Sequence, residues 1–167
     1  MQYFQIILFA ALVIAIAVRI DAKKIKKYRL LAGRSCDEFL KFFDSLVSHS
    51  TNSDVHNLAY RGRILWELAE NLPEKVAAIH ILMGAAQTML ETTSQADIEK
   101  RKTVDDLGHK ALAAMANLSK IENEGMLSKI LRGKGAKFPD PQTVKKQKAI
   151  LLTKFSKKFG EPFTEAK

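Results

Sequence analysis

The sequence has little that could cross-link it or support metal chemistry. Cys36 is the only cysteine among 167 residues, which excludes an intrachain disulfide and fits a reducing compartment. The four histidines lack the spacing of metal ligands, and no cysteine or carboxylate completes a set with them. No stretch alternates apolar and polar residues as a β strand does. The remaining pattern is helical and predicts an all-α protein with no metal site, cofactor or catalytic residue.

Charged side chains are absent before Arg19. Residues 3–18 are apolar except for Gln5, and residues 1–20 together reach the roughly 20 residues that span a bilayer as a helix. All seven basic residues of the first 34 follow this run, opposed only by Asp21. We therefore expect a retained transmembrane helix at 1–20 and a basic juxtamembrane segment at 21–34, with the remainder in the cytosol. A cleaved export signal and an interfacial helix are the alternatives.

Charge is distributed unevenly along the chain, whose net charge is +9. Residues 1–34 carry seven basic and one acidic side chain, residues 35–128 nine and fourteen, and residues 129–167 eleven and three. Because the central region is acidic, the pattern argues against nucleic-acid binding, which needs positive charge on the folded domain. The two basic ends are instead expected to contact a membrane or an acidic surface, through Lys23, Lys24, Lys26, Lys27, Lys154, Lys157 and Lys158.

Residues 35–131 are predicted to form a helical domain of antiparallel hairpins, either a stack or a small bundle. Ser35 and Glu38 have the spacing of a capping box that begins the first helix. Pro73 suits the first turn of a helix ending near Glu91, which is apolar nearly all round and therefore central. The predicted core includes Leu65, Trp66, Ala69, Leu82, Leu152 and Phe155.

The C-terminal region is predicted to hold a Gly/Pro linker at 132–141, a basic amphipathic helix at 142–160 and a tail at 161–167. Asp140 is placed to cap that helix, with Pro141 in its first turn. Its apolar side either covers the helical domain or inserts Phe155 and Phe159 into an anionic leaflet. A third alternative is that its lysines bind an acidic protein.

Three stretches resemble the regulator of microtubule dynamics family, to which the protein tyrosine phosphatase-interacting protein is related. They are residues 37–70 with their Leu65-Trp66-Glu67-Leu68-Ala69 core, Ile79–Gly84 and Lys148–Lys158. The chain is similar to a divergent or shortened member. The resemblance implies a tetratricopeptide-like helical fold and, as in some members, an N-terminal membrane anchor. It also implies residence at the mitochondrial outer membrane or endoplasmic reticulum, with phospholipid or tubulin as partner.

Together these features predict a non-enzymatic, membrane-anchored adaptor of helical repeats that binds protein and lipid partners at an organelle surface. The alternative is a small accessory subunit of a larger membrane complex. Phe42-Phe43-Asp44-Ser45 also resembles the centre of a tract that binds vesicle-associated-membrane-protein-associated partners. Phe43, however, lies on the apolar face of a predicted helix, which favours a core position over a recognition motif.

Overall fold

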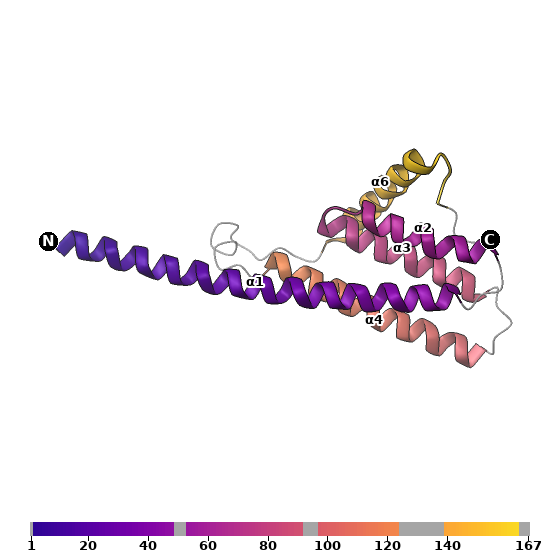
Figure 1. Ribbon diagram of the computed structural model, residues 1–167, viewed down its shortest axis with the longest axis horizontal. Coiled ribbons are helices and arrows are strands. Elements are labelled where there is room, and N and C mark those ends of the chain that lie inside the picture. The colour runs from indigo at the N-terminus through magenta and orange to yellow at the C-terminus, as the bar shows by residue number, and fades with distance from the viewer. Residues whose placement is uncertain (1, 49–52, 92–96, 124–138, 164–167) are drawn as a thin grey trace.

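The computed structural model describes residues 2–48, 53–91, 97–123 and 139–163. Every element within these ranges is an α-helix, which confirms the all-α prediction for them. The helices are α1 (Gln2–Ser48), α2 (Ser53–Leu68), α3 (Leu72–Glu91), α4 (Asp97–Asn123) and α6 (Pro141–Phe159). Helices α2, α3 and α4 pack against the C-terminal part of α1, and α6 packs on α3 and α2, while the N-terminal part of α1 projects alone along the long axis (Figure 1). We call residues 6–20 the arm, and α1 from Ala32 onward together with the other helices the body.

Helix α1 is continuous where the sequence predicted two separate elements. The expected helix start at Ser35 is wrong, because residues 2–48 form a single helix. The Ser35 hydroxyl does not cap a helix and instead accepts a hydrogen bond from the Asn117 side-chain amide at 2.7 Å. The expected boundaries between an anchor at 1–20, a segment at 21–34 and a domain beginning at 35 therefore fall inside one continuous helix.

The predicted transmembrane helix is also wrong. In the ranges that the structure describes, no helix is both long enough and apolar enough to cross a bilayer. The unbroken apolar run extends only from Ile6 to Val18, because Gln5 precedes it and Arg19 follows it. At 1.5 Å per residue this run covers about 20 Å, short of the roughly 30 Å thickness of a hydrocarbon core.

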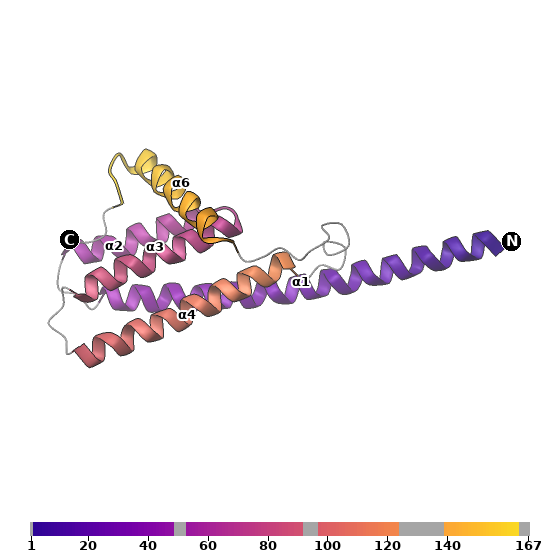
Figure 2. The same ribbon diagram turned by 180° about the vertical axis from the view of Figure 1, so that it is seen from behind.

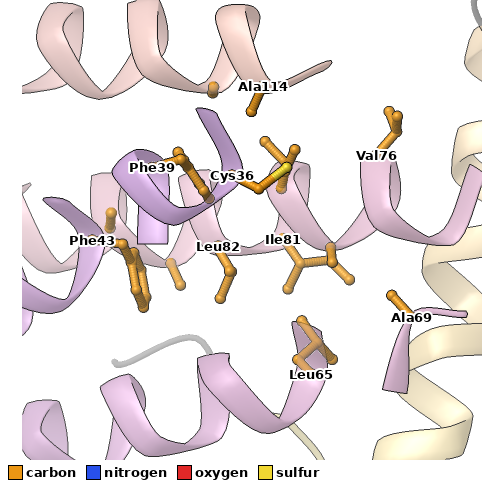
Figure 3. Packing of buried hydrophobic residues seen from close by; sticks show 14 of the residues in the cluster. Cys36, Phe39, Phe43, Leu65, Ala69, Val76, Ile81, Leu82 and Ala114 are labelled. Atoms are coloured by element: carbon orange, nitrogen blue, oxygen red, sulfur yellow. The ribbon is translucent and has the colours of Figure 1, made fainter. Parts of the chain in front are cut away.

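Helix α3 is the centre of the body, as its uniformly apolar sequence predicted. It contacts each of the other four described helices. Its buried residues lie on all sides, and Figure 3 shows Ile81 and Leu82 of α3 among Phe39 and Phe43 of α1 and Leu65 of α2. Helix α1 packs most extensively against α4, so the first and fourth helices lie side by side (Figure 2). In a linear repeat stack each unit contacts only its neighbours, so the arrangement is a small bundle.

Helix α6 covers the face of the body formed by α3 and α2. Its start is as predicted: the Asp140 carboxylate accepts a hydrogen bond from the Thr143 N–H at 2.9 Å, and Pro141 occupies the first turn. The helix ends at Gly160, whose φ of 73° is left-handed and whose N–H bonds to the Ser156 carbonyl. Within α6, the side chains of Val144, Leu151 and Phe155 are buried.

Candidate functional site

The arm of α1 holds nine of the fourteen exposed large apolar side chains in the part of the chain that the structure describes. These side chains leave 44–68% of their surface exposed, whereas most large apolar side chains of the body, Phe39, Phe43 and Phe155 among them, are buried. The exposed set is Ile6, Ile7, Phe9, Leu12, Val13, Ile14, Ile16, Val18 and Ile20. Scattered exposed apolar residues are normal on a protein surface, but a contiguous patch of this extent marks an interaction site. The arm is helical in the structure, with its backbone hydrogen bonds formed within the helix.

The basic residues of α1 begin where the arm ends. Lys23, Lys24, Lys26 and Lys27, which the sequence predicted as contact residues, are all exposed, as are Arg19, Arg29 and Arg34. In the described ranges, none of these seven forms an ion pair with a carboxylate. The structure therefore places a segment with seven basic side chains and one acidic side chain, Asp21, directly beside an exposed apolar one.

The structure places the predicted contact lysines of α6 in two different environments. Lys157 and Lys158 are exposed in the last turn, where their charge also favours the helix dipole. Lys154 is instead engaged in the body: its ammonium lies 2.7 Å from a carboxylate oxygen of Glu74 in α3. Phe155 is fully buried and rests against Phe159 and Phe163, so insertion of Phe155 into a leaflet is excluded by its place in the core.

The pair of Glu74 and Lys154 belongs to a network that joins α3 to α6. The second carboxylate oxygen of Glu74 accepts a hydrogen bond from the Glu70 N–H at 2.8 Å, and the Glu74 N–H donates to the Asn71 side chain at 2.9 Å. Burial opposes ionisation of Glu74, but the hydrogen bonds from Lys154 and Glu70 and the charge of Lys154 outweigh it, so its pKa is lowered. The sequence prediction missed this network, although Asn71 and Glu74 have the spacing of a capping box.

Among the other predicted core residues, Leu65, Ala69 and Leu82 are buried, whereas Leu152 is half-buried. Trp66 is only half-buried as well, and the Lys75 ammonium lies 4.3 Å from its ring centroid. Burial lowers the pKa of Lys75, which is consistent with its place against the indole.

The Phe42-Phe43-Asp44-Ser45 stretch is part of the body. Phe43 is enclosed in the core, and Asp44 forms an ion pair with Arg63 of α2. The Ser45 hydroxyl donates to the carbonyl of Phe42 at 2.8 Å. With Phe43 and Asp44 both committed to internal contacts, the stretch is not free to act as a recognition motif.

Reactive chemistry has little support in the described part of the chain. No group of three or more histidine, cysteine, aspartate or glutamate side chains there could hold a metal ion. Cys36 is buried, and this burial raises the pKa of its thiol to about 11, which leaves it protonated and unreactive at neutral pH. Burial, reinforced by Lys148, lowers the pKa of His80.

Comparison with known proteins gives no match: neither a protein-family model, nor a curated protein, nor a solved structure resembles this chain significantly. The resemblance to the regulator of microtubule dynamics family therefore stays a prediction from three short stretches.

Proposed function

We propose that the protein is a non-enzymatic helical adaptor that attaches to a lipid surface through its arm and presents the body to a protein partner. The observation that carries this proposal is the exposure of nine large apolar side chains on the arm, followed at once by seven basic residues. Transfer of one such side chain from water to an apolar phase contributes about 1.5–3 kcal/mol. Several of them together are enough to hold a small domain at a lipid surface.

Attachment of this kind does not require a crossing. An apolar run of about 10–14 residues fits a buried core helix, a re-entrant segment or an interfacial segment. The exposure of the arm favours the interfacial segment, whose apolar side chains enter the boundary between headgroups and acyl chains. The proposed organelle rests on the family resemblance alone, which supports a mitochondrial or endoplasmic reticulum surface. The same resemblance supports a role in organelle contact and is the basis for expecting a protein partner.

Vesicle flotation of the full chain, diluted from detergent, tests this function. The variant Phe9→Gln/Leu12→Gln removes two exposed apolar groups from the arm, and Leu112→Gln removes one from the outer face of α4, where Leu112 is 62% exposed. We expect the arm variant to bind vesicles at least about tenfold more weakly and the α4 variant to bind as the wild type does. Circular dichroism should be unchanged for both variants.

The proposal fails if the wild type does not float with any vesicle, or if the arm variant floats equally well. The first result would favour the alternative of an accessory subunit, in which a groove of another protein receives the arm.

A further inference from the structure

Five of the seven basic residues among the first 34 share one face of α1. Successive residues turn by about 100°, so the side chains of Arg19, Lys23, Lys26, Lys27 and Arg34 fall within roughly 100° of arc. We call this set the basic stripe; it extends for about 22 Å along the helix axis. Lys24 and Arg29 point about 110° to either side of its centre. The basic residues therefore form a line along the helix more than a ring around it.

The basic stripe faces away from the body. The opposite face of the same segment holds the residues that are buried or half-buried, Asp21, Ile25, Tyr28 and Ala32. Farther along the helix that face continues into the core through Phe39 and Phe43. Because α1 is one continuous helix, the body fixes the direction of the basic stripe.

Apolar residues lie on the same line as the basic stripe. Leu12 and Ile16 of the arm precede it on this face, and Leu30, which is 61% exposed, lies within it. Beyond Arg34 this face carries Asp37 and then Lys41, so the unbroken run of basic charge ends at Asp37. A line of cationic side chains interspersed with exposed apolar ones matches the boundary of an anionic leaflet, where lysine stems lie among acyl chains and ammonium groups reach the headgroups.

We propose that α1 meets an anionic lipid surface at a shallow angle, with the arm inserted, the basic stripe against the headgroups and Leu30 buried beside them. This inference rests on the proposed function and adds the lipid class and the orientation of the body. In an end-on arrangement the seven basic residues would be equivalent, and Leu30 would stay in water. The shallow arrangement makes one face of α1 responsible for lipid selectivity.

Two double variants with the same change in charge separate these arrangements. Lys23→Glu/Lys26→Glu reverses two charges of the basic stripe, and Lys24→Glu/Arg29→Glu reverses two charges outside it. Binding of the full chain is measured with vesicles of phosphatidylcholine alone and of phosphatidylcholine mixed with phosphatidylserine. Each charge near the surface contributes about fivefold to binding. We expect the first variant to lose at least about 25-fold on mixed vesicles, and the second to lose a few-fold at most.

A fluorescent label reports the position of Leu30 directly. An environment-sensitive dye on Leu30→Cys should shift to the blue when mixed vesicles are added, whereas the same dye on Leu112→Cys should not. The native Cys36 is buried and does not compete for the dye. Both host positions are exposed to the same degree in the free protein, which makes the second a matched control.

The outcomes separate the inference from the function beneath it. If both charge variants lose binding equally, or if the dye at position 30 does not respond, the shallow arrangement is wrong and the arm alone attaches the protein. If the wild type binds both kinds of vesicle equally well, the inference is also wrong, but the proposed function is still supported. If the wild type binds neither kind of vesicle, the proposed function itself is wrong.

Discussion

Phe9 leaves 68% of its surface exposed, whereas Phe43, farther along the same helix, leaves 1% exposed. Phe9 lies in the nearly uniformly apolar arm and Phe43 on the apolar face of an amphipathic segment, and backbone hydrogen bonds hold both segments in the same helical conformation. The difference is that the second segment has α4, α2 and α3 packed on it, while the arm projects beyond the body. An apolar segment is therefore expected to be buried against something. The fold determines whether other helices of the same chain bury it, as they do for Phe43, or do not, as for Phe9.

The strongest way to test this contrast is to remove an aromatic ring from each segment. Phe43→Ala empties a site enclosed by α1, α2 and α3 and should lower the free energy of unfolding by about 3–5 kcal/mol. Phe9→Ala removes the same ring from an exposed position and should change it by less than about 0.5 kcal/mol. Denaturant unfolding followed by circular dichroism measures both. Equal losses in the two variants would show that the arm packs against the body in solution.

The arm-side half of α1 and the body also differ in the environment of their charged side chains. On α1 the lysines are exposed, whereas Glu74 is buried and bonded to Lys154 and to the Glu70 N–H. Glu74→Gln removes the negative charge but keeps the shape, and we expect it to cost about 1.5–3 kcal/mol of stability. Glu161→Gln is the matched control, because Glu161 is exposed in its 3.0 Å pair with Arg61. Its loss should stay within about 0.5 kcal/mol.

The pH dependence of the Glu74→Gln difference follows from the direction of the pKa shift. The pKa of Glu74 is lower in the folded protein than its ordinary value of 4.5. Its contribution is therefore complete above that value and is lost as the pH falls through the lowered folded pKa. The stability gap between the wild type and Glu74→Gln should shrink on acidification. A gap that is independent of pH down to the acid transition would mean that the carboxylate charge does not stabilise the body.

Local features of the body could be predicted from the sequence, and long-range ones could not. The caps at Asp140 and Pro141 and the first turn at Pro73 depend on a few adjacent residues, and all of them are found where predicted. Ser35 failed as a helix start because a capping residue needs a non-helical neighbour before it, and α1 passes through it unbroken. The packing of α1 on α4 joins segments far apart in the chain, and no local pattern reports it.

The candidate site was predictable in content but not in geometry. The apolar run and the lysines at 23–27 are plain in the sequence, and counting charges finds them. A count does not distinguish Lys23 and Lys26 from Lys24, since that distinction depends on their phase around the helix. The direction in which each lysine points is fixed relative to the body because α1 is one continuous helix. The wrongly predicted helix start at Ser35 hid this continuity.

Glycine provides the smallest test of the contrast, because α1 and α2 each contain one inside a helix. At Gly62 in α2, an added Cβ would lie 2.8 Å from a Leu82 methyl carbon and 2.9 Å from the Phe43 ring, since α2 approaches both α3 and α1 closely there. At Gly33, near the start of the body, an added Cβ meets nothing within 4 Å. Alanine in a helix is favoured over glycine by roughly 0.5–1 kcal/mol, so Gly33→Ala should stabilise the protein by about that amount.

Gly62→Ala gains the same helix preference but must displace the Leu82 side chain and the Phe43 ring. Overpacking of a well-filled core costs about 1–3 kcal/mol, so the net change should be a loss of roughly 1–2 kcal/mol. The two substitutions are chemically identical, and the sign of their effects therefore reports how closely other helices approach each position. Thermal unfolding of the two variants measures it. A stabilised Gly62→Ala protein would mean that α2 lies farther from Phe43 and Leu82 than the structure places it.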